Sequence, residues 1–195
     1  LQIVGNYFKG VSGEYTDAIR LGGTGEDLEG TDGGCGVGDK LIIKNNHFID
    51  IGQRAIYIRL YTANKIAIEN NIFDNIGDAT YGGPIQIQGA NATSCELKVW
   101  YNTFQNINAK FVVRLNNQNV NNSWEAKVNY NQFENINDDA KFIEGYNQDI
   151  LIKAENNYYH DLYSASNFIN VIDFALACAT KDDYEKRVNA SLSDS

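Results

Sequence analysis

Arginine recurs at matching places in short runs of the sequence in which polar and apolar residues alternate. Arg20 lies in "DAIRL", Arg59 in "AIYIRL" and Arg114 in "FVVRL". A guanidinium group binds carboxylate or sulfate through two parallel hydrogen bonds and keeps its charge at any physiological pH. Stacked arginines repel one another, so their recurrence in a chain with only 16 basic residues favours an anionic ligand.

Aligning six such runs places one residue of each in a common outward column, to within a residue. This column holds Arg20, Arg59, Gln88, Arg114, Glu144 and Asn170. Tyr57 and Gln86 would stand in a neighbouring column, and a tyrosine ring can stack on the face of a sugar. The residues predicted to bind a glycan, in particular an acidic one, are Arg20, Tyr57, Arg59, Gln86, Gln88, Arg114 and Glu144. An ordinary solvated sheet face is the simpler alternative.

Carboxylates and histidines offer little for catalysis. A glycoside hydrolase needs two or three carboxyl groups roughly 5–10 Å apart, and Glu14 and Asp17 stand near Arg20 without a second cluster opposite them. The two histidines, His47 and His160, each lie inside the repeated phrase described below, which argues against histidine-based metal or triad catalysis. The three cysteines have no C-x-x-C spacing and predict neither a zinc site nor a disulfide framework.

A Gly-rich insertion at residues 22–39, "GGTGEDLEGTDGGCGVGD", interrupts the alternating pattern. Such an insertion leaves a repeat as a loop, and loops of repeat proteins often form the binding face. Its carboxylates are the hard oxygen ligands that Ca²⁺ prefers, so Glu26, Asp27 and Asp32 are candidate calcium ligands. Their spacing matches neither an EF-hand nor a nonapeptide calcium repeat, and a solvated loop without metal is the alternative.

Copies of one phrase must hold these residues in place. An asparagine is followed two residues later by an aromatic residue, as in "NNIFDNIG" at 70–77 and "YNTFQNIN" at 101–108. The asparagines are Asn6, Asn46, Asn71, Asn102, Asn131 and Asn157, and the aromatic residues are Phe8, Phe48, Phe73, Phe104, Phe133 and Tyr159. Copies at intervals of 25 to 40 residues identify a repeat protein.

The residues before each phrase alternate strictly, as in "KLIIKNN" and "KIAIENN", which predicts a strand. The second alternating run follows, so one repeat is a strand, a bend, a strand and a variable loop. Two or three short strands per repeat fit one coil of a parallel β-helix, where each strand pairs with its equivalents above and below. Leucine-rich repeats need an L-x-x-L-x-L frame and propeller blades need about 40 residues and four strands, and the sequence fits neither.

The bend between the two strands of each repeat explains why asparagine recurs there. Its side chain offers a donor and acceptors, and asparagine tolerates left-handed backbone angles. We therefore expect a hydrogen-bonded asparagine ladder beside an internal aromatic stack, repeated at the strand spacing of about 4.7–4.9 Å.

These N-x-F/Y phrases after alternating strands resemble the right-handed, single-stranded parallel β-helix repeats of the pectin lyase-like superfamily. The resemblance covers about residues 1–172 and implies about six coils. The superfamily includes polysaccharide lyases, glycoside hydrolases, phage tailspikes and surface adhesins, so the repeat indicates fold better than activity. "NTFQNINAKFVVRL" is also similar to a lyase segment whose catalytic arginine would be Arg114, but the preceding coil, "GGPIQIQGANATS", lacks the glutamate pair and the lysine of those enzymes.

Composition narrows the class of partner. The 195 residues, 43% of them hydrophobic, suffice for one core. The net charge of −9 argues against nucleic acid and anionic membranes as partners, and no apolar run approaches the roughly 18 residues of a membrane span. Because residue 1 is leucine and the first repeat begins within five residues, we interpret the chain as part of a longer, secreted or cell-surface polypeptide.

The predicted organisation is an all-β stack of coils over residues 1–172 and a C-terminal cap or tail over 173–195. Thr180 would cap a short helix across "KDDYEKRV" and close the open end of the stack. The predicted function is that of a β-helix segment that binds an acidic polysaccharide. The alternative is a fragment of a polysaccharide lyase or glycoside hydrolase, and no catalytic residue is assigned.

Overall fold

The structure, a computed structural model, describes residues 1–13, 16–22, 40–59, 64–77, 82–88, 94–116, 123–137, 140–146 and 150–160. All regular secondary structure in these residues is β-strand. None of the described segments is a helix long and apolar enough to cross a membrane. The predicted C-terminal helix, the calcium loop beyond Gly22 and Asn170 lie outside the described residues.

The strands form three parallel sheets. The first sheet consists of β1 (Gln2–Val4), β4 (Lys40–Lys44), β7 (Lys65–Glu69), β10 (Ser94–Trp100), β13 (Ser123–Asn129) and β16 (Ile150–Lys153). The second consists of β2 (Tyr7–Lys9), β5 (His47–Ile51), β8 (Ile72–Ile76), β11 (Thr103–Ile107), β14 (Gln132–Ile136) and β17 (Tyr158–His160). The third consists of β3 (Asp17–Leu21), β6 (Arg54–Arg59), β9 (Gly83–Gln88), β12 (Phe111–Asn116) and β15 (Lys141–Tyr146).

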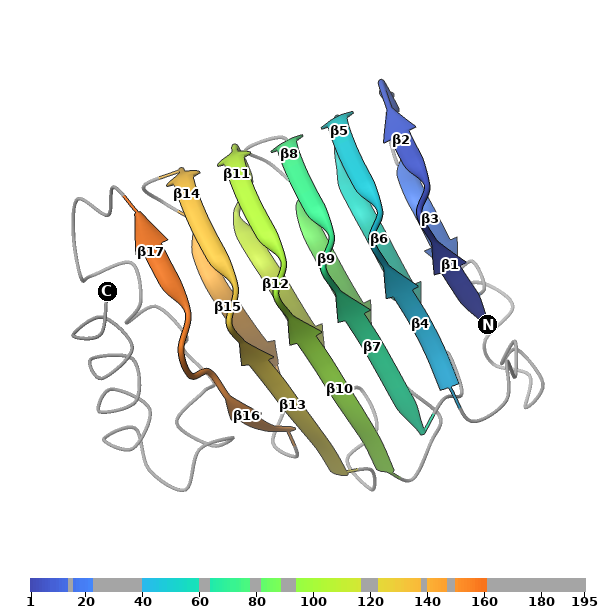
Figure 1. Ribbon diagram of the computed structural model, residues 1–195, viewed down its shortest axis with the longest axis vertical. Helices are drawn as coiled ribbons and strands as arrows, with labels where there is room; N and C mark the ends of the chain where they lie inside the picture. The colour runs from blue at the N-terminus through green and yellow to red at the C-terminus, as the bar shows by residue number, and fades with distance from the viewer. Residues whose placement is uncertain are drawn as a thin grey trace.

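Each strand pairs with the strands three places before and after it in the chain. One coil therefore contributes one strand to each sheet, and the coils lie side by side from blue at β1 to orange at β17 in Figure 1. This arrangement confirms the predicted right-handed parallel β-helix of about six coils.

The predicted asparagine ladder is confirmed at the bend between the first and second sheets. Asn71 donates from its backbone N–H and from Nδ2 to Oδ1 of Asn102, both at 3.0 Å. Its Nδ2 also donates to the backbone oxygen of Ile43, at 3.0 Å. The first two bonds recur from coil to coil between Asn6, Asn46, Asn71, Asn102, Asn131 and Asn157. The ladder satisfies buried polar groups that would each cost about 1–3 kcal/mol if left unpaired.

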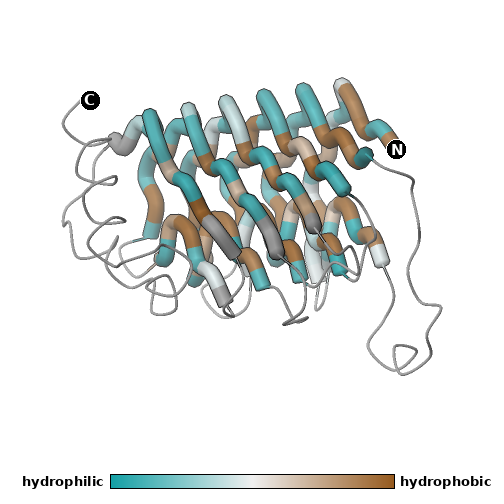
Figure 2. Tube along the Cα trace, turned by 90° about the horizontal axis from the view of Figure 1, so that it is seen from below, coloured by the Kyte–Doolittle hydropathy of each residue, from teal (hydrophilic) through white to brown (hydrophobic). Residues whose placement is uncertain are grey.

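The aromatic stack is confirmed as well. Ring centroids of successive phenylalanines are 4.8–5.1 Å apart and their planes are within 17° of parallel, from Phe8 through Phe48, Phe73 and Phe104 to Phe133. The last four are fully buried. Tyr159 follows Phe133 in backbone register. Aliphatic residues of the other two sheets complete the core, and apolar and polar residues alternate along each coil in Figure 2.

The left-handed backbone lies one residue earlier than the asparagine to which the sequence assigned it. The residue before each ladder asparagine has a φ between 52° and 70°; these residues are Gly5, Asn45, Asn70, Tyr101, Tyr130 and Asn156. Glycine and asparagine adopt such angles readily, which explains the frequent "NN" in the phrase. For tyrosine the same conformation costs about 1–2 kcal/mol, so Tyr101 and Tyr130 depart from the pattern.

Lysines and glutamates of successive coils form a chain of ion pairs on the outer face of the first sheet. Glu96 bonds Lys98 at 3.1 Å and lies 3.6 Å from Lys65 of the coil before. Glu125 pairs at 3.1 Å with Lys153 of the coil after it. The hydrogen bond from Lys98 lowers the pKa of Glu96, and the bond from Lys153 lowers the pKa of Glu125. Each exposed pair is worth about 1 kcal/mol or less.

We predict that Phe73→Ala lowers the free energy of unfolding by about 3–5 kcal/mol, because it opens a cavity inside the stack. Urea unfolding monitored by circular dichroism measures the change. Ile72→Ala is the matched control, since Ile72 is the neighbouring residue but points outward and is 39% exposed. A surface change of this kind should stay within about 0.5 kcal/mol. Equal losses from the two variants would contradict the internal position of the stack.

We also predict that the ion-pair chain makes stability depend on pH. A carboxylate whose pKa is lowered by folding contributes stability that is complete above its ordinary pKa, 4.5 for these glutamates, and that is lost as the pH falls through the folded-state pKa. The double variant Glu96→Gln, Glu125→Gln should therefore lose less stability than the wild type between about pH 6 and pH 3. Urea unfolding across this range measures the difference. Glu134→Gln, an exposed change on β14, should follow the wild-type curve.

Candidate functional site: the outer face of the third sheet

Strand register arranges the outward side chains of the third sheet in two columns. The first column holds Arg20, Tyr57, Gln86, Arg114 and Glu144, one on each strand from β3 to β15. The second column lies two residues further along the strands and holds Arg59, Gln88 and Asn116. The predicted single column is thus wrong for Arg59 and Gln88. Side chains two residues apart face the same side of a strand, so alternation alone could not distinguish the two columns.

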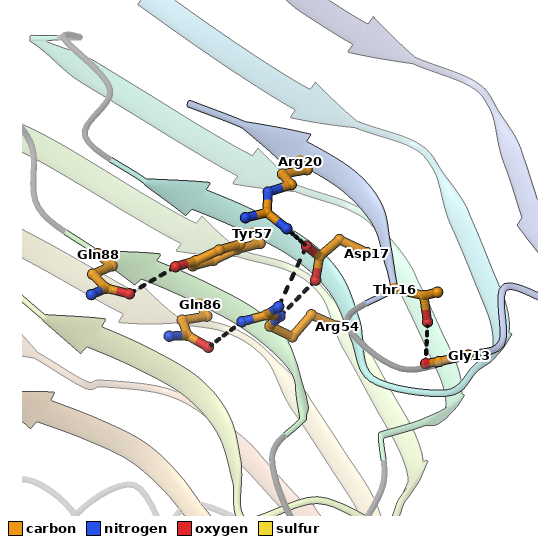
Figure 3. Close-up of polar contacts among 8 residues, drawn as sticks. All are labelled: Gly13, Thr16, Asp17, Arg20, Arg54, Tyr57, Gln86 and Gln88. Carbon is orange, nitrogen blue, oxygen red and sulfur yellow. Dashed lines mark hydrogen bonds and ion pairs between the residues drawn. The ribbon is translucent and has the colours of Figure 1, made fainter. Parts of the chain in front are cut away.

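Asp17 anchors two arginines at the β3 end of this face. Its carboxylate accepts a hydrogen bond from Nε of Arg54 at 2.6 Å and another from Nη1 of Arg20 at 3.3 Å. The Asp17 side chain is 1% exposed, whereas those of Arg54 and Arg20 are 13% and 34% exposed. Burial raises the pKa of Asp17, and the charge of Arg54 acts in the opposite direction. The buried carboxylate therefore fixes two guanidinium groups from below (Figure 3).

Tyr57 lies between the same two arginines. The Cζ atom of Arg54 is 4.1 Å from the centre of the tyrosine ring, and that of Arg20 is 5.3 Å from it (Figure 3). The residue is only 4% exposed. Its hydroxyl donates to Oε1 of Gln88 at 2.8 Å. The ring therefore supports the guanidinium groups and presents no free face to a sugar, contrary to the stacking role suggested by the sequence.

A second buried carboxylate organises the β12–β15 end. Glu144, 3% exposed, accepts hydrogen bonds from Nε of Arg114 and from Nζ of Lys141, the latter at 2.8 Å. The guanidinium of Arg114 also lies 3.8 Å above the ring of Phe111. Glu144 thus holds two cations in the way that Asp17 does, and it is a supporting residue rather than an exposed ligand-binding one.

Arg59 differs from the other three arginines of this face. No described carboxylate pairs with it, and its buried Nε has no hydrogen-bond partner. Its neighbour in the column is Gln88. Oε1 of Gln88 accepts a hydrogen bond from the Tyr57 hydroxyl, so the NH₂ group of Gln88 points away from the tyrosine. Arg59 and Gln88 therefore place hydrogen-bond donors next to each other, the combination that an oxyanion requires.

The structure brings together all seven residues predicted from the sequence, but with different roles. Tyr57, Gln86 and Glu144 are buried, while Arg20, Arg59, Gln88 and Arg114 remain accessible to solvent. Sequence reasoning missed Arg54 and Lys141 as members of the face. The spacing of three residues between Lys141 and Glu144 in "KFIE" was the available signal for Lys141. Arg54 had no such local signal, because it pairs with Asp17 of the preceding coil.

Asp17 and Glu144, the two buried carboxylates of this face, do not form a hydrolytic pair. Asp17 and Glu144 lie on the two edge strands of the third sheet, and four strand spacings separate them by about 19 Å. Glycosidases need about 5–10 Å. Glu14 lies outside the described residues.

Other candidate groups in the described part of the chain are not arranged for chemistry. No three histidine, cysteine, aspartate or glutamate side chains there could hold a metal ion, and Glu26, Asp27 and Asp32 fall outside it. Cys95 points into the core as a free thiol, and burial raises its pKa to about 12, so it stays protonated and unreactive.

Comparison with protein families, with curated proteins and with solved structures finds no match for this chain. The β-helix is therefore established by strand pairing and by the asparagine ladder.

We predict that Asp17→Ala lowers the free energy of unfolding by about 3–5 kcal/mol, because it leaves the largely buried Arg54 without its carboxylate. Adding Arg54→Ala should recover part of this loss, since no unpaired charge then remains. Chemical unfolding of both single variants and the double variant completes the cycle. Strictly additive losses would show that the two side chains are not coupled.

Proposed function

We propose that this chain is an extracellular or cell-surface β-helix segment that binds an acidic polysaccharide on the outer face of its third sheet. The observation that carries the proposal is a local excess of positive charge. Among the described residues of this face, five cations stand with two carboxylates, Asp17 and Glu144; the cations are Arg20, Arg54, Arg59, Arg114 and Lys141. The chain as a whole carries a net charge of −9. An acidic protein with four arginines on one face provides a local site for an anion.

The way these arginines are held supports recognition rather than stability alone. Both carboxylates are buried under the cations, so neither covers the guanidinium edges that face outward. Guanidinium groups fixed in this way lose less conformational entropy when they bind a ligand. Arg59 is half-buried and pairs with no carboxylate among the described residues, so a ligand carboxylate or sulfate that reaches it has no described ion pair to displace.

The spacing of the coils suits a polymer. Adjacent coils are about 4.8 Å apart, so a glycan that crosses them meets cations on several coils. An exposed ion pair is worth about 1 kcal/mol or less, and binding should therefore be weak per sugar. Affinity should rise with chain length and fall with salt.

We predict that oligogalacturonates bind the wild type with an affinity that grows from trimer to decamer, and that Arg20→Gln, Arg59→Gln weakens decamer binding at least about tenfold, a loss of about 1.4 kcal/mol. Isothermal titration calorimetry at low and at physiological salt measures both effects. The matched control is Lys9→Gln, Lys40→Gln, which removes the same charge from exposed lysines of the other two sheets.

If the control weakened decamer binding as much as the arginine variant does, net charge alone would explain the effect, and there would be no specific site on this face. Equal binding of neutral dextran would contradict the requirement for an acidic ligand. Dextran sulfate separates recognition of sulfate from recognition of carboxylate within the same proposal.

A polysaccharide lyase is the second candidate, and the Arg114–Glu144–Lys141 cluster favours it. The coil before Arg114 lacks a glutamate and a lysine, but the coil after it supplies both. Cations neutralise a uronate carboxylate, and a lysine could accept the neighbouring proton once it has given up its own. New unsaturated ends, detected by ultraviolet absorbance during incubation with polygalacturonate, would support this candidate over simple binding.

A further inference from the structure

A cluster of three aromatic rings, two exposed tyrosines and a partly buried tryptophan, occupies the bend between the first and second sheets, away from the basic face. Tyr101 and Tyr130 stand immediately before ladder asparagines of adjacent coils, and Trp100 precedes Tyr101. The two tyrosines are 53% and 42% exposed. They are the two large side chains in a column whose other members are glycine or asparagine.

Their backbone conformation is unfavourable for tyrosine. Tyr101 has a φ of 56° and Tyr130 a φ of 58°, in the left-handed region where asparagine or glycine fits better. Strained residues that recur in a regular fold are frequent at functional sites. Two adjacent coils here replace the residue that suits the bend by one that does not, and both replacements are the same aromatic side chain.

The three rings form one ordered group. The tyrosine rings stack with centroids 5.1 Å apart and planes 13° from parallel. The indole of Trp100 lies edge-on to both, at 6.2 Å from Tyr101 and 6.1 Å from Tyr130. Nζ of Lys98 lies 5.1 Å from the centre of the indole. The rings therefore hold each other in place before any ligand arrives.

One face of each tyrosine ring is covered by the other tyrosine. The opposite faces point toward the neighbouring coils, where the column carries Asn70 and Asn156, which are both exposed and much shorter than tyrosine. A flat ligand of about the thickness of a strand spacing can therefore continue the stack on either side.

We propose that Trp100, Tyr101 and Tyr130 form a platform for a β-linked hexopyranose with equatorial hydroxyl groups, such as the units of a neutral glucan. The axial C–H groups of such a sugar make an apolar, slightly positive face that suits the negative face of an aromatic ring. The phenol hydroxyls and Lys98 offer hydrogen bonds to the sugar hydroxyls at the rim.

A protein partner fits this cluster less well than a sugar. A stable protein interface covers about 800 Å² on each partner, far more than three rings provide. The residues that share the column of Trp100 include Lys44, Glu69 and Glu155, so charged side chains bound the cluster on both sides. The site is independent of the proposed acidic-glycan face, which lies on the third sheet.

The test is calorimetric titration of the full chain with cellohexaose. A second readout is tryptophan fluorescence in a Trp124→Phe background, where Trp100 is the remaining tryptophan of the two in the chain. The variant Tyr101→Asn, Tyr130→Asn removes both rings and installs the residue that the other coils use. We expect it to bind cellohexaose at least tenfold more weakly and to unfold at the same or a higher urea concentration. Tyr101→Phe, Tyr130→Phe keeps the rings and should retain binding within about threefold.

Tyr7→Asn is the matched control, because Tyr7 of the second sheet is 60% exposed and contacts His47 rather than this cluster. It should bind as the wild type does. The Arg20→Gln, Arg59→Gln variant should also bind cellohexaose normally, which separates this site from the basic face. Absence of cellohexaose binding by the wild type, or unchanged binding by the asparagine variant, would overturn the proposal. The proposal would also be overturned if the asparagine variant lost stability as well as binding, because the rings would then serve packing.

Discussion

One directional amide hydrogen bond, repeated from coil to coil, holds the register on which the molecule depends. Each ladder asparagine donates to Oδ1 of the next one, and buried ladder members are at most 2% exposed. The bond closes the bend between two sheets, where strand pairing alone would leave backbone groups unsatisfied. A slip by one residue would break every rung and turn the core side chains outward. The ladder therefore fixes which residues reach each face as well as the spacing of the coils.

In-register parallel stacking places equivalent residues of successive coils next to one another. The core and the two outer faces accommodate these neighbours in different ways. Inside, phenylalanine stacks on phenylalanine at little cost. On the first sheet, Lys98, Lys127 and Lys153 form one column beside a column that holds Glu96 and Glu125, and ion pairs between the two columns neutralise the like charges. On the third sheet the arginines are not stacked as the sequence suggested, because no two described arginines are partners in register. Buried carboxylates, Asp17 and Glu144, pair with three of them instead. That arrangement leaves the guanidinium groups accessible, and it gives the face its excess of positive charge.

Both proposed sites rest on residues that vary between coils, whereas the residues that repeat serve the fold. The ladder asparagines and stacked phenylalanines occur in coil after coil and are buried. Arg59 and the tyrosines at the bend are departures. Among the described residues no carboxylate pairs with Arg59, in contrast to the other arginines of its face. Tyr101 and Tyr130 accept a left-handed backbone that asparagine adopts more readily. In each case the chain keeps a locally unfavourable feature at the surface, where a ligand can reach it.

The sequence by itself determined the fold, the ladder and the internal stack, because these follow from a period of two along the strands and from a phrase repeated at coil length. It also placed Arg20, Arg114 and Glu144 in one column, since these occupy equivalent places in their runs. The tertiary structure decided the rest. A shift by two residues leaves the outward pattern unchanged, so only strand pairing showed that Arg59 stands beside Gln88. Burial of Tyr57 and Glu144 arises from side chains of other coils, as does the pairing of Asp17 with Arg54 across 37 residues. Those contacts depend on which coils are neighbours and how their side chains pack, and no local pattern in the sequence encodes that.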